Sequence, residues 1–508
     1  MLIAGVAFVV LLVAGANFES ANWPYRYRKI KPMLEDVLAS QVTISHYHRV
    51  YFPNPGFMAT NLTMRRKSAP DLPPLGSVES MTVEGSWIDL LMLRQRVHLV
   101  KITGLHIVVP AIGSRENHED FPAGSSSDFG GPATRIDQME VHNSVLDIMR
   151  ADGSRLSFPV AQLELRNLHK GEGMTYALDM RNARPTGRIQ VRGGFGPIDP
   201  KNMGSTPISG EFTFFSVNLH EVGDISGTLG SSGHFKGVLG AIEADANSKT
   251  PDFAVKRGKP TAVLGTIQCT VDGTNGDLKI HSIEVKTGAT TIHAEGQITG
   301  SPKITNLDLT VMRGRAEDVL RPFIHKDVPI VGPVWLKSHA YLGPSGNEFL
   351  QRLRVDGTFV APGELVSDRR TEHDLSEFSL RAQSNKPASS DAGSGDEAST
   401  SATDVLSSLK GPAIIRDGVV SSRRLMFQVA GAEADLTGTF NFHNENVRLA
   451  GNLKMDTDIS HTTTGLKSWL LKPLAPIFKR KNKGAVVPIA VTGGPGHYKV
   501  TQDLMHSK

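Results

Sequence analysis

The sequence predicts a mainly β fold: an N-terminal transmembrane helix followed by a long antiparallel sheet with a few short helices. Three observations point to this class. Apolar and polar residues alternate one by one through much of the chain, which is the period of a strand with one apolar face. Gly (50) and Pro (29) are frequent while aromatic residues make up 6%, as expected for a turn-rich β chain. The first 18 residues are uncharged and almost wholly apolar.

The N-terminal stretch, residues 1–18, would rise about 27 Å as a helix, just short of a hydrocarbon core of about 30 Å. We expect an uncleaved anchor; a removed signal peptide, cut near Ala14–Ala16, is the alternative. Arg26, Arg28 and Lys29 follow the span, which by the positive-inside tendency favours a cytoplasmic body. A basic segment upstream of residue 1 would resolve that conflict.

The clearest alternation lies in residues 431–459, which are typical of a hairpin. Both apolar faces share one side only if the loop has an even number of residues, so the loop is either 444–445 or 443–446. This register pairs Phe442 with Val447, Phe440 with Leu449, and Leu436 with Leu453.

Comparable strands are expected at 77–83, 97–103, 105–109, 187–194, 208–219, 261–271, 278–285, 290–296, 307–311 and 484–492. Ile292 lies on the apolar side of its strand, and Leu307 and Leu309 answer it after the next turn. Short helices are expected at 31–42 and 316–324, and residues 87–93 fit either a helical turn or a buried strand. Cys269, the single cysteine, is expected to be buried, and it excludes an intrachain disulfide or a cysteine-based metal site.

The expected organisation has six parts. They are a transmembrane anchor (1–18), a first part of the sheet with a short helix (19–112), a flexible loop (113–132), a central part of the sheet (133–383), a disordered insertion (384–403) and a C-terminal meander with an amphipathic segment (404–500). The insertion is assigned because it has no apolar run that could offset the entropy lost on ordering.

No motif predicts catalysis, a cofactor or a metal. His46 and His48 share one side of a strand but have no third ligand at a recognisable spacing. The glycine-rich residues 227–235 lack the Lys and Ser or Thr that a phosphate loop needs, and a Gly-rich strand turn explains them better. The net charge of +4 is too balanced to predict a nucleic-acid partner. We therefore expect a protein that is not an enzyme.

Residues 465–483 combine apolar side chains at near-helical spacing with a basic end. Such a segment can lie on an anionic membrane surface, although Pro473 and Pro476 would interrupt a long helix. The alternative is a segment that caps the core and ends in a solvated basic tail. The residues expected to contact a membrane are Trp469, Leu470, Lys479, Arg480 and Lys481.

The apolar face has two readings. It either closes on itself as a sandwich or barrel core, or the sheet curls into a trough whose lining binds an apolar ligand. A sixteen-carbon chain moved from water gains on the order of 12 kcal/mol, which is enough to justify an open trough. The expected lining residues are Leu436, Phe440, Phe442, Val447, Leu449, Leu453, Ile292, Leu307 and Leu309.

The chain resembles the AsmA-like family of envelope proteins. The resemblance is carried by the N-terminal span, the short helix with its basic flank and four segments, which are YFPNPGFMATNLTMRR (51–66), GSVESMTVEG (76–85), VHLVKITGLHIVVP (97–110) and the closing region 461–494. It implies an inner-membrane anchor that holds a long, curled, groove-shaped antiparallel sheet in the periplasm. It also implies bridge-type passage of phospholipid between the inner and outer membranes, with envelope proteins as further partners, and it brings no catalytic residues.

We therefore expect a single-pass inner-membrane protein, with its bulk in the periplasm, that binds acyl chains along a β-sheet groove and aids phospholipid transport. The alternative is a non-enzymatic structural scaffold for outer-membrane protein assembly, with a closed β core that binds no lipid. An enzyme that acts on polysaccharide is a third and weaker alternative.

Overall fold

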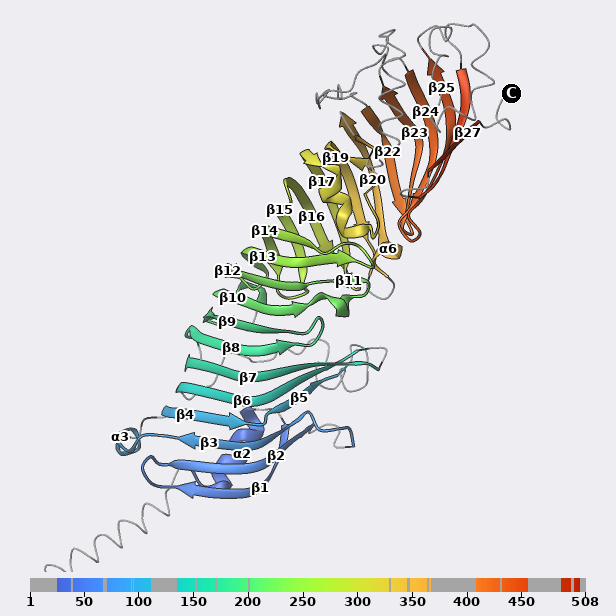
Figure 1. The fold of residues 1–508 in the computed structure, drawn as a ribbon. Helices are drawn as coiled ribbons and strands as arrows, with labels where there is room; N and C mark the ends of the chain where they lie inside the picture. The colour runs from blue at the N-terminus through green and yellow to red at the C-terminus, as the bar shows by residue number, and fades with distance from the viewer. Residues whose placement is uncertain are drawn as a thin grey trace, which may run out of the picture. The chain divides into compact units, whose positions relative to one another are not determined.

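The computed structural model describes residues 25–37, 40–66, 71–92, 94, 96–110, 135–150, 153–169, 171–199, 202–328, 330–344, 348–362, 365–366, 408–429, 432–455, 486–494 and 498–502. The chain is mainly β, with a large mixed sheet and few helices (Figure 1). It divides into unit 1 (Met1–Phe215 and Gly233–Ile242) and unit 2 (Ser216–Ser232 and Glu243–Lys508). The expected anchor 1–18, loop 113–132, insertion 384–403 and segment 465–483 lie outside the described residues.

None of the helices in the described part of the chain is both long and apolar enough to cross a bilayer.

The elements of unit 1 follow one another with short connections, apart from the one after β5. They are α2 (Tyr27–Val37), β1 (Ser40–Val50), β2 (Gly56–Arg66), β3 (Gly76–Glu84), α3 (Trp87–Leu91), β4 (Arg96–Thr103), β5 (His106–Val109), β6 (Arg135–Met149), β7 (Arg155–Leu168), β8 (Met174–Asn182), β9 (Gly187–Phe195), η1 (Met203–Ser205) and β10 (Pro207–Asn218). Three strands, β10, β12 (Thr228–Val238) and β13 (Ala241–Val255), have residues in both units.

The sheet of unit 1 is mixed, so the expectation of an antiparallel sheet throughout was wrong. Strands β1 to β4 pair antiparallel in order, and β6 to β10 do the same. Between these two groups, β4 and β5 both pair parallel with β6. A parallel pair needs a connection of a dozen or more residues, and residues 110–134, most of which were expected to be a surface loop, are long enough to supply it.

The first helix begins and ends earlier than the predicted range of 31–42. It spans Tyr27–Val37, and β1 begins at Ser40. Val42 is fully buried in β1, where it pairs with Met64, and its backbone N–H donates to the Glu35 carboxylate at 3.1 Å. The burial of Val42 in the sheet therefore overrides the helical spacing that the sequence shows. The ambiguous residues 87–93 contain the short helix α3.

Unit 2 is built from antiparallel pairs. Its elements are η2 (Leu219–Val222), β11 (Ile225–Ser226), β14 (Thr261–Asp272), β15 (Asp277–Thr287), β16 (Thr290–Thr299), β17 (Ile304–Arg315), α5 (Ala316–Leu320), η3 (Arg321–Phe323), β18 (Ile330–Val331), β19 (Pro333–Leu342), α6 (Phe349–Arg352), β20 (Leu353–Pro362), β21 (Leu365–Val366), β22 (Ser408–Arg416), β23 (Val419–Val429), β24 (Ala432–Asn441), β25 (Asn446–Met455), β26 (Val486–Gly493) and β27 (Lys499–Gln502). The predicted strands of this region and the helix at 316–324 are confirmed, and Cys269 is buried in β14.

The hairpin of β24 and β25 has the expected shared apolar side but a register that differs by two residues. Phe440 pairs with Val447, and Leu436 pairs with Gly451. The backbone N–H of Glu445 donates to the carbonyl of Asn441 at 2.7 Å, and the Asn441 side chain accepts from the N–H of His443 at 2.7 Å. These bonds end β24 at Asn441 and place residues 442–445 in the loop, which moves the pairing toward the start of β24.

The sheet of unit 2 curls, so that strand ends far apart in the pairing order meet. From β14 to β24 the ladder contains nine strands, counting both ends. With neighbouring strands about 4.8 Å apart, β14 and β24 would be about 40 Å apart in a flat sheet. Yet Lys256, just before β14, has its Nζ 2.9 Å from Nδ1 of His443 in the β24–β25 turn. The Lys256 ammonium also lies 2.6 Å from the Glu348 carboxylate.

A second contact joins the same turn to the chain after η3. The Glu445 carboxylate is buried and accepts from the backbone N–H groups of His325, at 2.6 Å, and Lys326, at 3.1 Å. We call Lys256, Glu348, His443 and Glu445 the latch. Helix α5 packs on the apolar side of β17 and β19, and the chain that follows α5 and η3 reaches the β24–β25 turn across the curl. The apolar face is therefore the inner face of this curl.

Candidate apolar binding face

The apolar face of β7–β10 in unit 1 is made of rows of side chains that run across the strands. One row contains Leu163, Leu178, Val191 and Phe212, each paired with the next. The rows on either side of it contain Leu165, Tyr176, Gly193 and Gly210, and Val160, Met180, Ile189 and Phe214. All of these side chains are half-buried, and none belongs to a buried core cluster. Their own neighbours in the sheet shield them, and none of the described elements lies over them as an opposing layer.

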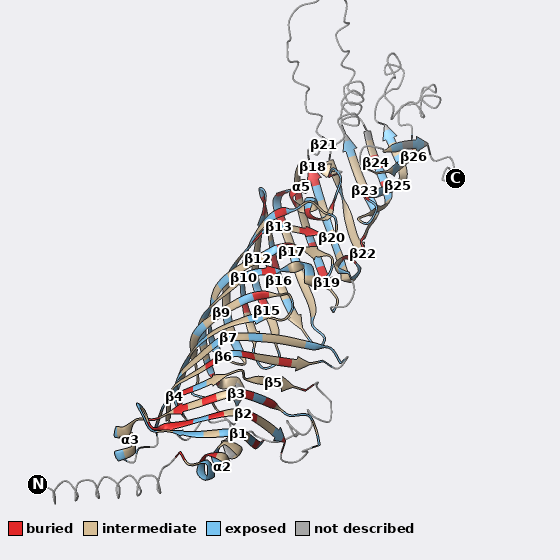
Figure 2. Ribbon diagram, turned by 60° about the horizontal axis from the view of Figure 1, so that its bottom comes forward, coloured by how far each residue is buried: buried red, intermediate tan, exposed pale blue. Residues whose placement is uncertain are grey.

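The same face of β1–β4 is covered. Ile30 of α2 and Tyr25, two residues before the helix, lie on this side of the sheet, where they form a core with strand residues such as Phe57, Leu62 and Val100. Phe57 stacks on Tyr47 with ring centroids 5.3 Å apart and is 1% exposed. Figure 2 shows buried residues concentrated on β1–β4, whereas β7–β10 are mostly intermediate or exposed.

Aromatic rings and glycines shape the uncovered face of β7–β10. Phe212 contacts Phe214 edge-to-face at 5.3 Å and Phe235 at 6.4 Å between ring centroids. A Cβ at Gly210 would lie 2.8 Å from the Phe235 ring and 3.1 Å from the Tyr176 hydroxyl. Gly210 therefore leaves the space into which these two rings lean, and the face is ridged rather than flat.

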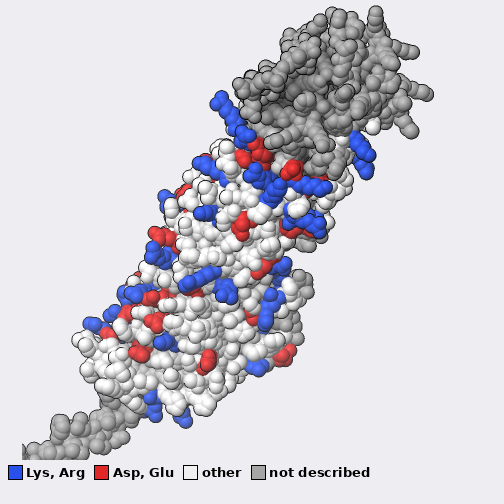
Figure 3. Space-filling view, viewed as in Figure 1, with Lys and Arg blue, Asp and Glu red and all other residues white. Residues whose placement is uncertain are grey.

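The opposite face of β7–β10 is polar, and its charged side chains form ion pairs with one another. Arg188 binds Asp179, and Arg192 binds Glu211 at 2.8 Å. The hydrogen bond from Arg188 is the main reason that the pKa of Asp179 lies below its usual range; burial opposes it and the bond from Gln190 adds to it. Figure 3 shows basic and acidic side chains interspersed on the side of the molecule that it presents. Charges paired in this way favour a solvated outer surface.

A hollow of 410 Å³ lies on this polar face. Its lining residues are Gln162, Ala177, Leu178, Asp179, Gln190, Val191, Arg192, Glu211, Phe212 and Thr213. The small side chain of Ala177 leaves the hollow between the two ion pairs. Leu178, Val191 and Phe212 belong to the row of the apolar face, and the other lining side chains, apart from Ala177, are amides, a hydroxyl and paired charges. The hollow therefore does not suit an acyl chain.

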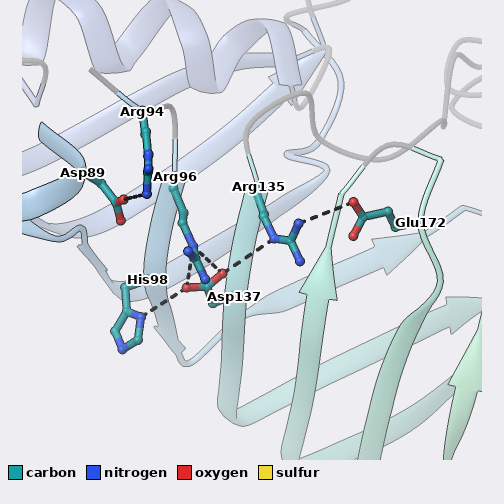
Figure 4. A network of polar contacts seen from close by, with 7 residues as sticks. All are labelled: Asp89, Arg94, Arg96, His98, Arg135, Asp137 and Glu172. Carbon is teal, nitrogen blue, oxygen red and sulfur yellow. Dashed lines mark hydrogen bonds and ion pairs between the residues drawn. The ribbon is translucent and has the colours of Figure 1, made fainter. Parts of the chain in front are cut away.

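A polar network joins β4, β6 and the turn between β7 and β8 (Figure 4). The Arg96 guanidinium donates to Asp137 at 2.9 Å, and Nδ1 of His98 lies 3.2 Å from the same carboxylate. Burial would raise the pKa of Asp137, but the hydrogen bonds from Arg96 and His98 and their positive charges lower it overall. Arg135 extends the network to Glu172 at 3.4 Å. These contacts tie the two parallel-paired strands together.

In unit 2 the expected lining residues of β16 and β17 lie in rows of the apolar face. Ile292 pairs with Val311, Ala294 with Leu309, and Gly296 with Leu307. Ile292 packs partly buried against a cluster that contains Ala316 of α5, so this row is covered. Leu307 and Leu309 are half-buried. The row through Leu307 continues by direct pairing through Ala340, Val355, Ile415, Val420, Phe440 and Val447.

The expected lining residues of the C-terminal hairpin separate into three groups. Leu436 is buried in a cluster against which Leu449 and Leu453 pack. Phe440 and Val447 are half-buried and end the long row. Phe442, expected in the strand, lies instead in the turn. Its ring is 5.9 Å from Phe323 and 5.2 Å from Phe440.

None of the lining residues predicted from the sequence lies on β7–β10. Tyr176, Leu178 and Met180 alternate with Thr175, Ala177 and Asp179, so the period of two was present in the sequence. The expected membrane-contact residues, Trp469, Leu470, Lys479, Arg480 and Lys481, lie outside the described residues. Among the residues that are described, no group of three or more His, Cys, Asp or Glu side chains is placed to hold a metal ion.

Comparison with known proteins does not assign a family. No protein-family model matches the chain, and a search of curated proteins finds no match either.

Proposed function

We propose that this protein binds acyl chains along the apolar face of its sheet and aids phospholipid transport between two membranes. The observation that carries the proposal is the face of β7–β10, where rows of large apolar side chains have no opposing layer within the part of the chain that the structure describes. The proposal includes a single-pass anchor in the inner membrane and a body in the periplasm, as the resemblance to AsmA-like proteins implies.

The geometry suits a chain-like apolar ligand better than a compact one. Each lipid methylene removed from water contributes about 0.8 kcal/mol, so affinity grows with the length of chain laid on the surface. Rows that run across successive strands provide such a length without a deep pocket. The aromatic side chains of Tyr176, Phe212 and Phe235 form a ridge that would pack against one side of the flexible acyl chain.

Photo-crosslinking on the two faces of β8 tests the proposal. A photoreactive phenylalanine analogue at Leu178 faces the apolar side, whereas the same group at the neighbouring Ala177 faces the polar side. In cells with two envelope membranes, we expect lipid adducts at position 178 and an adduct yield at 177 no higher than background. Equal labelling at both positions, or no adduct at either, contradicts the proposal.

A charged substitution on each face extends the test to transport. Leu178→Arg should block phospholipid passage while the chain stays folded, because the guanidinium would be desolvated along the ligand path. Ala177→Arg is the matched control and should leave passage unchanged. Unfolding of the Leu178→Arg variant at ordinary temperature would instead indicate that the face is a closed core.

A non-enzymatic scaffold for outer-membrane protein assembly is the second candidate. The observation that favours it is the covered face of β1–β4, where Phe57, Leu62 and Val42 are buried beneath α2 as in an ordinary core. A scaffold would copurify with envelope proteins and carry no lipid. Mass spectrometry of the purified protein, with and without bound phospholipid, distinguishes the two candidates.

A further inference from the structure

Large apolar side chains are exposed at one end of the first strands in unit 1. Phe52, in the turn between β1 and β2, is 88% exposed, and Leu91, Ile88 and Met92, in and just after α3, are 76%, 63% and 58% exposed. Ile88 and Leu91 are three residues apart, so they lie on one side of the helical turn. We call Phe52, Ile88, Leu91 and Met92 the apolar patch.

The two parts of the apolar patch are held together by hydrogen bonds. The indole N–H of Trp87, the first residue of α3, donates to the carbonyl of Pro53 at 3.1 Å, and the N–H of Gly85 donates to the carbonyl of Pro55 at 2.7 Å. The β1–β2 turn and α3 lie at the same end of the strands in Figure 1. The patch is therefore one surface on a fixed support.

The described chain begins at this same end. The Tyr25 hydroxyl lies so close to Gly85 that a Cβ there would meet it at 2.3 Å, and the Tyr25 carbonyl accepts from the Tyr47 hydroxyl at 2.5 Å. Residues 1–18, the uncharged apolar stretch of the sequence, thus precede a residue that is fixed beside the patch. If that stretch is in a bilayer, only residues 19–24 separate the bilayer from the patch.

Basic side chains lie on α2 and on the segments that carry the apolar patch. Arg28 and Lys29 of α2 and Arg49 at the end of β1 are exposed, and Arg94, after α3, is 60% exposed and 3.9 Å from Asp89. An exposed apolar surface with basic side chains nearby suits the boundary between headgroups and acyl chains of an anionic bilayer.

We propose that the apolar patch docks unit 1 on the surface of the bilayer that holds the N-terminal stretch, with Phe52, Ile88 and Leu91 inserted among the lipids. The inference rests on the proposed function, because docking would bring the apolar face of the sheet to the source of its acyl chains. The occupant is a phospholipid bilayer, and Arg28, Lys29 and Arg94 would favour anionic headgroups.

Depth-dependent fluorescence quenching tests the docking. The full chain, with Cys269→Ser as background, is labelled at Ile88→Cys with an environment-sensitive fluorophore and reconstituted in vesicles of phosphatidylcholine and phosphatidylglycerol. Nitroxide groups on the lipid acyl chains should quench this label and shift its emission to the blue. The same label at Leu264→Cys, an exposed position of β14 in unit 2, should show neither effect.

A double variant shows whether the side chains of the patch cause the docking. Phe52→Ser with Leu91→Ser should lower the ratio of docked to undocked protein at least about tenfold, because two large apolar side chains no longer leave water. Phe215→Ser, which removes an aromatic side chain 42% exposed elsewhere in unit 1, is the matched control and should leave quenching unchanged.

The outcomes separate docking from lipid carriage. An unquenched label at position 88, with lipid adducts still formed at position 178, overturns the docking and keeps the proposed function. Quenching at position 88 without any lipid adduct at 178 keeps the docking and removes the carrier. Quenching that persists in the double variant assigns the proximity to the N-terminal stretch alone and overturns the role of the patch.

Discussion

Strands β1–β4 and β7–β10 of unit 1 have the same alternation of apolar and polar residues but a different cover. Under α2, Val42 and Phe57 are 0% and 1% exposed, whereas Leu178 and Phe212 on β7–β10 are half-buried. Alternation therefore shows which side of a strand is apolar, and a second element decides whether that side becomes a core. The comparison explains how one sheet can contain both a buried core and an apolar face that no described element covers.

The connections explain why only one of the two regions is covered. Helix α2 precedes β1 and places Ile30 on the sheet, with Leu34 packed against the same core. Strands β7, β8 and β9 are joined by residues 169–173 and 183–186, which are too short to form a covering helix. Neither of these two connections thus supplies a covering segment for the apolar face of β7–β9.

The largest expected effect comes from truncating one aromatic residue in each region. Phe57→Ala should lower the free energy of unfolding by about 3–5 kcal/mol, because it leaves a cavity between Tyr25 and Tyr47. Phe212→Ala should cost about 1–2 kcal/mol, since its side chain is already half-exposed. Chemical denaturation of the full chain measures both. Equal losses would mean that β7–β10 are covered as well.

The buried carboxylate of Asp147 lies on β6, between the two regions. Nε2 of His106 is 2.8 Å from it, Arg155 is 3.3 Å away, and the Ser157 hydroxyl donates to it. Burial would raise the pKa of Asp147, but the bonds from Ser157 and His106 and the charges of Arg155 and His106 lower it overall. The ionised form therefore stabilises the fold above the usual carboxyl pKa of about 4, and this contribution is lost as pH falls through the lower folded pKa.

Asp147→Asn should cost about 2–3 kcal/mol at neutral pH, because it removes the charge from a buried, hydrogen-bonded group. The variant should also lose part of the decline in stability below pH 4 that the parent chain shows. Thermal unfolding across an acidic pH series measures both effects. Parallel pH curves for variant and parent would show that another carboxylate controls the acid transition.

Much of the fold could be predicted from the sequence, because the period of two survives in nearly every strand. The strand at 261–271, for example, matches β14 to within a residue. What failed depended on tertiary contacts. Val42 was predicted to be the last residue of the first helix but lies in β1. The parallel pairing of β4 and β5 with β6 depends on the path of a long connection, and no local sequence pattern specifies that path.

The sequence predicts that the sheet has one apolar face, but it does not predict which strands leave that face uncovered. Leu307 and Phe440 do lie in one row of the apolar face and Leu309 in the next row, since alternation fixes the side on which they point. Phe442 does not, because the hydrogen bonds that Asn441 accepts from the N–H groups of His443 and Glu445 place it in the turn. Whether a row is covered depends on α2 and α5, whose positions over the strands the sequence does not encode locally.

The latch in unit 2 is a contact that holds the curl of the sheet, whereas α2 in unit 1 is an element that covers its apolar face. Glu445 is buried, has φ of +56°, and holds the backbone of His325 and Lys326. Glu445→Ala should cost about 1–2 kcal/mol, because two N–H groups lose their acceptor. Faster hydrogen exchange at His325 and in the β24–β25 turn should accompany the loss, and Glu445→Gln, which keeps one acceptor, should show a smaller change. Unaltered exchange in both variants would mean that sheet twist alone holds the curl.

The smallest expected effect comes from the polar face of β7–β10. Arg192 and Glu211 form an ion pair whose side chains are 77% and 64% exposed, and pairs of this kind contribute about 1 kcal/mol or less. Replacing both with Ala should therefore leave stability nearly unchanged, and it should leave lipid adducts at position 178 unchanged as well. Loss of adducts in that variant would place the ligand on the polar side, near the hollow around Ala177, and would reverse the assignment of the two faces.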